Sequence, residues 1–157
     1  CLGRVINGEP QFYYGGEASP VLAGTFADLA GRSNLPRVDV IYGCAGMPVD
    51  LVRYSTERSA GIVLAGMGNG SMPSDIRKAL NLAVREGKPV VRASRTGGAP
   101  VTDLEEYAAF IASGMLSTPK ARVLLMLALA EAERQGVRDP EARVASVRRA
   151  FTHCREV

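Results

Sequence analysis

Beyond residue 36 the chain alternates short apolar runs with longer amphipathic segments. Short, continuous apolar runs are typical of parallel strands that are buried on both faces, and the segments between them suit crossover helices. The runs predict strands over 38–42, 61–65, 89–94 and 109–112. This alternation predicts an α/β fold, a small doubly wound domain of the Rossmann-like or flavodoxin-like kind with about four parallel strands.

Four helices are predicted from the helical spacing of apolar residues. Two of them, over 48–58 and 74–86, connect the first three strands. A third begins after 117–119, where a capping serine and a first-turn proline are followed by residues that are apolar nearly all round, so we expect it to cover the sheet. Asp139-Pro140-Glu141 predicts the start of a last helix, with an apolar stripe of Val144, Val147 and Phe151.

The first 36 residues follow a different pattern. Residues 2–14 predict a β-hairpin, because Asn7-Gly8 favours a type I′ turn, although Pro10 weakens the second strand. A lone hairpin is barely stable in water, so we expect these strands to belong to a sheet whose other members lie outside this chain. Gly, Pro, Ser and Asn then dominate, which is typical of an interdomain linker. The predicted division is a terminal hairpin of a missing amino-terminal domain over 1–14, a linker over 15–36 and an α/β domain over 37–157.

Composition narrows the function classes. The net charge of +3 comes from arginines in the last quarter, without interleaved aromatic residues or a nucleic-acid motif, so we expect solvated helix faces and no nucleic-acid binding. No apolar run approaches the ~20 residues that span a bilayer, so no membrane association is expected. Three scattered cysteines suit neither a disulfide framework nor a zinc site. The chain starts with Cys1 rather than Met and lacks a signal-peptide pattern, which suggests a piece of a longer protein.

The carboxyl edge of the predicted sheet is the expected ligand surface. In open parallel sheets ligands bind beyond the carboxyl ends of the strands, and the loops there are rich in small and polar residues. The 66–71 loop approximates the dinucleotide fingerprint G-x-G-x-x-G, with Ser71 in third place. That fingerprint also needs an acid near the end of the next strand, but Glu86 ends a helix and the strand carries Arg92 instead. A nucleotide-binding regulatory module therefore stays an alternative that rests on a lone motif.

The sequence shows no complete catalytic set. The single histidine, His153, lies beside Cys154 in the last helix, and adjacent helical positions point in different directions, so a Cys-His dyad is not expected. Asp103, Glu105 and Glu106 follow the third strand on the ligand side. Such carboxylates perform acid/base chemistry or bind an ammonium group, but a solvated acidic turn is the commoner reading.

Three stretches resemble the carboxyl-terminal part of bacterial L-asparaginases, closest to the type II class that includes the glutaminase-asparaginases. They are GIVLAGMGNG over 61–70, GKPVVRASR over 87–95 and FIASGMLSTPKARVLL over 110–125. The hairpin over 1–14 also resembles the last hairpin of the family's larger first domain. The resemblance implies hydrolysis of L-asparagine to L-aspartate and ammonia by a threonine nucleophile in that absent domain, with no metal or organic cofactor. It implies that the fragment alone is inactive.

The resemblance also implies partners. The family's smaller domain completes the substrate site of a neighbouring subunit in an intimate dimer, and two dimers form a homotetramer. We therefore expect the amino-terminal domains of the same and of a neighbouring subunit as partners, together with L-asparagine and L-aspartate. The type II class suggests the periplasm, with the cytoplasm as the alternative. A non-catalytic interaction domain is a further alternative, because the acidic loop is shorter than in the family.

Site residues follow from the same resemblance. In the family the residue after the G-x-G-N-G turn is Asn or Ser and helps to hold the substrate; here it is Ser71, close to Asn69. A hydroxyl lacks the paired donor and acceptor of an amide, which would relax the preference for asparagine over glutamine. A family glutamate faces the substrate's α-amino group, and Asp103 or Glu105 is its counterpart, with Glu105 preferred. The predicted substrate-binding residues are therefore Ser71, Glu105 and Asn69.

Overall fold

One parallel sheet forms the centre of the protein. The computed structural model describes residues 3–6, 8–12, 26–97 and 100–153. Its strands are β3 (Val38–Tyr42), β4 (Gly61–Gly66), β5 (Val90–Ser94) and β6 (Ile111–Ala112), which lie side by side in chain order and all run parallel. The predicted α/β fold with four parallel strands is confirmed.

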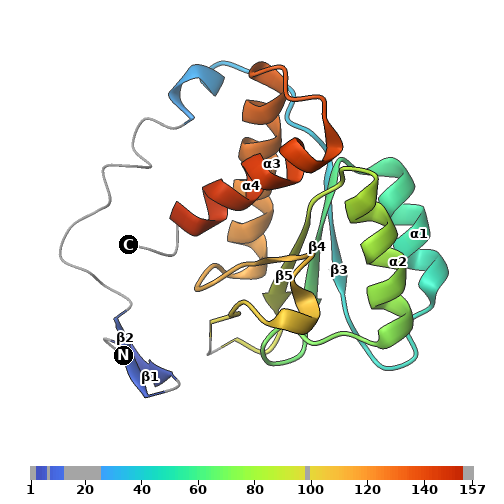
Figure 1. Cartoon of the computed structure of the whole chain (residues 1–157), viewed down its shortest axis with the longest axis vertical. Coiled ribbons are helices and arrows are strands. Elements are labelled where there is room, and N and C mark those ends of the chain that lie inside the picture. The colour runs from blue at the N-terminus through green and yellow to red at the C-terminus, as the bar shows by residue number, and fades with distance from the viewer. Residues whose placement is uncertain (1–2, 7, 13–25, 98–99, 154–157) are drawn as a thin grey trace.

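Helices cover both faces of this sheet (Figure 1). Helices α1 (Val49–Arg58) and α2 (Ser74–Arg85) cross between consecutive strands and lie on one face, while α3 (Thr118–Arg134) and α4 (Pro140–His153) follow the last strand and cover the other. Successive side chains of a strand point to opposite faces, so Ile62 and Leu64 of β4 pack on the α1 and α2 side, and Val63 packs on the α3 and α4 side. Burial on both faces explains why β4 is a continuous apolar run.

The last strand is shorter than predicted. A strand over 109–112 was expected, but β6 contains only Ile111 and Ala112. The preceding residues are held by other groups: the N–H of Phe110 donates to the carbonyl of Tyr107 at 2.8 Å, and the guanidinium of Arg148 on α4 binds the carbonyls of residues 108–110 at 2.9–3.2 Å. The Phe110 N–H and the carbonyls of residues 108–110 therefore form hydrogen bonds outside the sheet, and do not pair with a neighbouring strand.

The predicted start of α3 is correct only in part. Pro119 lies in the first turn as predicted, but the Ser117 hydroxyl is not hydrogen-bonded to the N–H groups of the described first turn. The hydroxyl of Thr118 instead donates to the carbonyl of Ser94 at 3.2 Å, which ties α3 to the end of β5. The helix covers the sheet, yet one side faces solvent, where Val123 is 52% exposed. For α4 the predicted Asp139 cap is confirmed by a 2.8 Å bond to the Ala142 N–H.

The amino-terminal region contains the predicted hairpin and a short helical turn. Strands β1 (Gly3–Ile6) and β2 (Glu9–Phe12) pair antiparallel, and Gly8 has the positive φ of +85° that the predicted turn requires. The 3₁₀ helix η1 (Ala27–Leu29) lies in the second half of the predicted linker, where Leu29 is buried and η1 packs on α3. The expected extension of the second strand to residues 13 and 14, Asn7, and linker residues 15–25 lie outside the described residues.

Candidate functional site

A tight turn follows β4 and presents Ser71 at the carboxyl edge of the sheet. This glycine turn (residues 66–71) folds back over Gly66, where an added Cβ would lie only 2.3 Å from the Ser71 carbonyl oxygen, so only glycine fits. Two backbone bonds close it, from the Met67 N–H to the Ser71 carbonyl at 3.2 Å and from the Ser71 N–H to the Met67 carbonyl at 2.9 Å. The side chain of Ser71 is exposed and therefore accessible to a ligand.

The glycine turn packs directly on β5 and on the segment that follows it. Gly70 has a φ of +72°, and a Cβ there would lie 3.2 Å from the Cβ of Arg92 and 3.3 Å from Cγ1 of Val101. Val101 begins the acidic loop (residues 101–107), whose last three residues form the 3₁₀ helix η2 (Glu105–Tyr107). The positive φ and the close approach together explain the glycine at residue 70.

Asn69 joins the glycine turn to the acidic loop. Its Nδ2 donates to the Thr102 hydroxyl at 2.8 Å, and its Oδ1 accepts from the Thr102 N–H at 2.8 Å. The amide is thus engaged within the chain, and among the described residues its second N–H hydrogen has no acceptor. The structure therefore brings together two segments that are 33 residues apart, and places Ser71 and the acidic residues at the same edge.

Arg92 makes a second connection between the same two segments. Its side chain is 1% exposed, and its guanidinium donates to the carbonyls of Asn69 at 2.6 Å and Thr102 at 2.7 Å. The guanidinium carbon lies 4.3 Å from the centre of the Tyr107 ring, a cation–π contact. Burial lowers the pKa of Arg92, whereas Tyr107 and the carboxylates of Asp103 and Glu106 raise it, and an arginine stays protonated at neutral pH.

Sequence reasoning missed this role of Arg92. The signal was present, because a single charged residue interrupts the apolar run of β5, but it was interpreted only as the lack of an acid for a dinucleotide site. The structure shows the guanidinium occupied by two carbonyls of its own chain. β5 therefore presents no acid to a ribose, and the dinucleotide alternative gains no support.

The three acids of the loop have different surroundings. All three are exposed, and Glu106 forms an ion pair at 2.9 Å with Arg77 of α2. Glu105 begins η2, and its carbonyl accepts from the Ala108 N–H at 3.1 Å. Asp103 lies directly after Thr102, the residue tied to the glycine turn. The ion pair with Arg77 holds Glu106 against α2, which distinguishes it from Asp103 and Glu105, the two proposed counterparts of the family glutamate.

Arg95 is a further charged group at this edge that the sequence reasoning did not single out. Its N–H donates to the carbonyl of Gly66 at 2.9 Å, and its exposed guanidinium lies against the sulfur of Met67, at 3.0 and 3.1 Å. Arg95, which directly follows β5, thus contacts the glycine turn through both its backbone and its side chain. A positive charge beside the turn favours ligands that carry a carboxylate.

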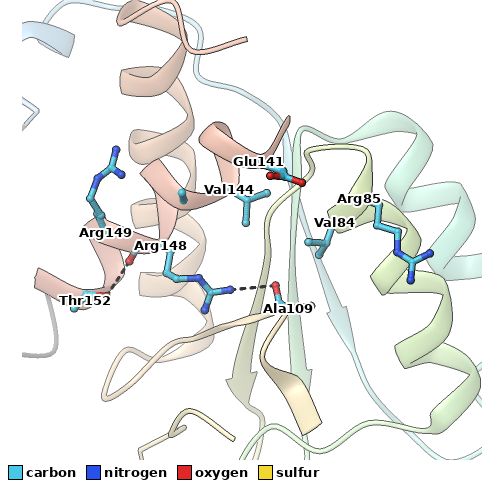
Figure 2. Close-up of a pocket in the computed structure, with 9 residues that line it drawn as sticks. Val84, Arg85, Ala109, Glu141, Val144, Arg148, Arg149 and Thr152 are labelled. Carbon is cyan, nitrogen blue, oxygen red and sulfur yellow. Dashed lines mark hydrogen bonds between the residues drawn. The ribbon is translucent and has the colours of Figure 1, made fainter. Parts of the chain in front are cut away.

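A groove of about 540 Å³ lies elsewhere, between α2, α4 and the residues before β6 (Figure 2). Arg85 ends α2 and Ala109 precedes β6, so the groove is at the amino edge of the sheet, opposite the glycine turn. Its Arg148 guanidinium points to the loop backbone and bonds the Ala109 carbonyl at 3.2 Å. The groove is therefore remote from the predicted site, and its central cation is occupied within the chain.

Other chemistry is limited in the described part of the chain. No group of three or more His, Cys, Asp or Glu residues gathers there in a way that could hold a metal ion. None of its helices combines the length and apolar character needed to cross a membrane. The prediction against a Cys-His dyad is not tested, because it concerns the side chain of His153, which the structure does not describe, and Cys154, which lies outside the described residues.

Comparisons with known proteins point to one family. The sequence profile of the Glutaminase/Asparaginase C-terminal domain matches residues 37–138. L-asparaginase 2 of Bacillus subtilis is 44% identical over 104 residues, which are 64% of this chain and 28% of that protein. L-asparaginase 2 of Escherichia coli is 37% identical over 136 residues, which are 83% of this chain and 38% of that protein.

A solved structure extends the likeness to the fold. The crystal structure of a probable cytoplasmic L-asparaginase from Campylobacter jejuni superposes with a TM-score of 0.71 at 28% identity, over 96% of this chain and 46% of that one. The chain spans about a third of the length of the curated relatives it matches. The likeness therefore covers nearly the whole of this chain but only part of each relative.

Proposed function

The chain belongs to the glutaminase/asparaginase C-terminal domain family, and from this premise we propose that it is the carboxyl-terminal domain of an L-asparaginase. The parent enzyme is an amidohydrolase that converts L-asparagine to L-aspartate and ammonia. The nucleophile is a threonine in an amino-terminal domain, and the present chain supplies substrate contacts. Alone it is inactive.

The observation that carries this proposal is the meeting of the glycine turn and the acidic loop. These two segments have the substrate-binding roles in the family resemblance, and the Asn69–Thr102 pair and Arg92 hold them together at the carboxyl edge. An amino acid substrate carries an ammonium and a carboxylate. The exposed hydroxyl of Ser71 and the exposed carboxylate of Glu105 offer a hydrogen-bonding group and a counter-charge for these groups.

Each proposed contact has a distinct task. Glu105 pairs with the α-ammonium of the substrate, Ser71 donates to a substrate oxygen, and Asn69 contributes its second amide hydrogen beside it. Because a single hydroxyl discriminates less between amide chain lengths than an asparagine side chain would, we expect appreciable hydrolysis of glutamine as well.

The proposed partners are the amino-terminal domains of the same and of a neighbouring subunit, in a homotetramer built from two dimers. In such an arrangement this domain supplies only the substrate contacts at its carboxyl edge, and the neighbouring amino-terminal domain supplies the nucleophile. The proposed compartment is the periplasm, because the resemblance is to the type II class; the cytoplasm is the alternative, because the similar Campylobacter jejuni protein is a probable cytoplasmic L-asparaginase.

Ammonia release from L-asparagine tests the proposal. We expect no release from the 157-residue chain alone, and release from the longer protein that carries it together with a threonine-containing domain. Release by the isolated chain would place a nucleophile within these residues and overturn the assignment. A longer protein without amide hydrolysis would favour the non-catalytic interaction domain.

Three isosteric variants of the longer protein identify the acid. Loss of a charged hydrogen bond costs about 1.5–3 kcal/mol, so Glu105→Gln is expected to raise the KM for L-asparagine by roughly 10- to 150-fold. Glu106→Gln is the matched control, because the ion pair with Arg77 directs its carboxylate to α2, and we expect the KM to stay within about 2-fold. An effect confined to Asp103→Asn would transfer the role to Asp103.

A further inference from the structure

Arg92 lies in the sheet, and its side chain contacts both proposed substrate-binding segments. It is in register with Leu64 on β4 and with Ala112 on β6, so its backbone is fixed on both sides by strand pairing. From this fixed backbone position, the Arg92 guanidinium donates hydrogen bonds to the carbonyls of Asn69 and Thr102. A group with a fixed base and two acceptors in different loops determines how far apart those loops lie.

Stability alone does not account for an arginine at this place. A buried charge is costly to remove from water, and an apolar residue of similar size is often as stable or more so. The site is also not fully compensated, because the buried Nε of Arg92 has no hydrogen-bond partner among the described residues. The two hydrogen bonds that its guanidinium does make go to the glycine turn and to the acidic loop, and not to the helices that cover the sheet.

We propose that Arg92 is a positioning residue that sets the spacing between the glycine turn and the acidic loop, and thereby between Ser71 and the acid that binds the substrate's ammonium group. The proposal rests on the proposed function. The guanidinium is a planar fork with donors at fixed positions, so its two bonds fix the separation of their acceptors. The Tyr107 ring lies 4.3 Å from the guanidinium carbon, which extends the constraint to η2 and therefore to Glu105.

Two properties follow from this geometry. Lysine keeps the charge but has no fork, so Arg92→Lys retains one carbonyl contact and gives an intermediate effect. Asn69 and Thr102 are still present in every Arg92 variant, so the two segments still meet, but their hydrogen bonds open more often because the spacing between the segments is no longer defined. The defect is thus one of geometry, not of unfolding.

The first test needs no activity and uses backbone hydrogen exchange on the full 157-residue chain. In Arg92→Met we expect the amide of Thr102, which donates to Asn69, and the amide of Ser71 to exchange at least 10-fold faster, and in Arg92→Lys we expect a smaller increase at the same two amides. Amides within α3 are expected to be unchanged. Arg122→Met is the matched control, because Arg122 donates to the Val38 carbonyl at the start of β3, the opposite edge of the sheet. Unchanged exchange at residues 71 and 102 in both Arg92 variants would overturn the proposal.

The second test is a double-mutant cycle in the longer protein. If Arg92 acts through the acid, Arg92→Met raises the KM for L-asparagine at least 10-fold with kcat changed less than about 3-fold, and the double variant with Glu105→Gln has the KM of Glu105→Gln alone. Arg92→Lys is expected between the parent and Arg92→Met, and provides the test should the methionine variant fold poorly. A KM equal to the parent's, or effects that multiply in the double variant, would contradict positioning.

Failure of the Arg92 proposal and failure of the proposed function can be told apart. A longer protein that hydrolyses no amide refutes the asparaginase assignment, but the exchange rates at Ser71 and Thr102 still decide whether Arg92 sets the spacing of the loops. Conversely, an active enzyme with a normal KM after Arg92→Met keeps the assignment and refutes only the role of Arg92.

Discussion

Replacing Gly66 by alanine would test whether the glycine turn is folded as described. The added Cβ would lie 2.3 Å from the Ser71 carbonyl oxygen, 2.6 Å from the Gly70 carbonyl carbon and 2.8 Å from the Gly70 oxygen. All three are backbone atoms, so no flexible side chain can move aside and the turn itself must shift. The shortest distance is about 1.1 Å inside the 3.4 Å at which ordinary contact begins.

Overpacking of this kind costs typically about 1–3 kcal/mol, and the size of the overlap with backbone places Gly66→Ala near the upper end, at about 3 kcal/mol. With a urea dependence of about 2 kcal/mol/M, the unfolding midpoint should fall by about 1.5 M with an unchanged slope. Equilibrium urea unfolding followed by circular dichroism measures both quantities.

Gly43→Ala is the matched control for this experiment. Gly43 is also buried and lies just beyond β3 at the same edge, but its added Cβ would meet only the Ala65 oxygen at 3.4 Å and the Gly66 Cα at 3.7 Å. We expect a change within about 0.5 kcal/mol. Equal midpoints for Gly66→Ala and Gly43→Ala would refute the folding of the turn over Gly66.

Two further predictions concern stability. Asp139→Ala removes the 2.8 Å cap on the Ala142 N–H and should cost about 1 kcal/mol, measured by the same urea titration; a midpoint equal to the parent's would show that the cap is not formed. Hydrogen bonding from Arg134 lowers the pKa of Glu131 from its ordinary 4.5, so the folded state binds this proton less readily than the unfolded state. The stabilisation from Glu131 is then full above about pH 4.5 and lost as the pH falls through the lowered pKa, so the advantage of the parent over Glu131→Gln should shrink from pH 6 to pH 3; a constant difference would contradict the pairing.

The sheet and its helices could be predicted because their signals are local. β4 was predicted over 61–65 and ends at Gly66, since a strand buried on both faces leaves an unbroken apolar run. β6 was predicted too long because its limits depend on Arg148, a residue of α4 about 40 positions away that takes the carbonyls of residues 108–110. The local pattern of apolar residues around 109–112 carries no information about a hydrogen-bond donor that lies so far away in the sequence.

The site could be predicted only as an edge and a turn. The alternating glycines indicated the turn, and Gly66 and Gly70 are required there by close backbone approach and by a positive φ. The Asn69–Thr102 pair and the bonds of Arg92 depend on the path of the acidic loop, and the loop's composition does not encode that path. The roles of Ser71, Glu105 and Asn69 in substrate binding remain predictions from the family resemblance.

Subunit complementation tests the central claim most directly. One variant of the longer protein lacks the nucleophilic threonine, and the other carries Ser71→Ala with Glu105→Gln, so each is expected to be defective alone. If this domain completes the site of a neighbouring subunit, dimers formed from the two variants contain one intact site, and random pairing restores about a quarter of the parent's ammonia release. Mixed dimers that form but release no more ammonia than either variant alone would show that the domain serves its own subunit's site, or none, and would contradict the account.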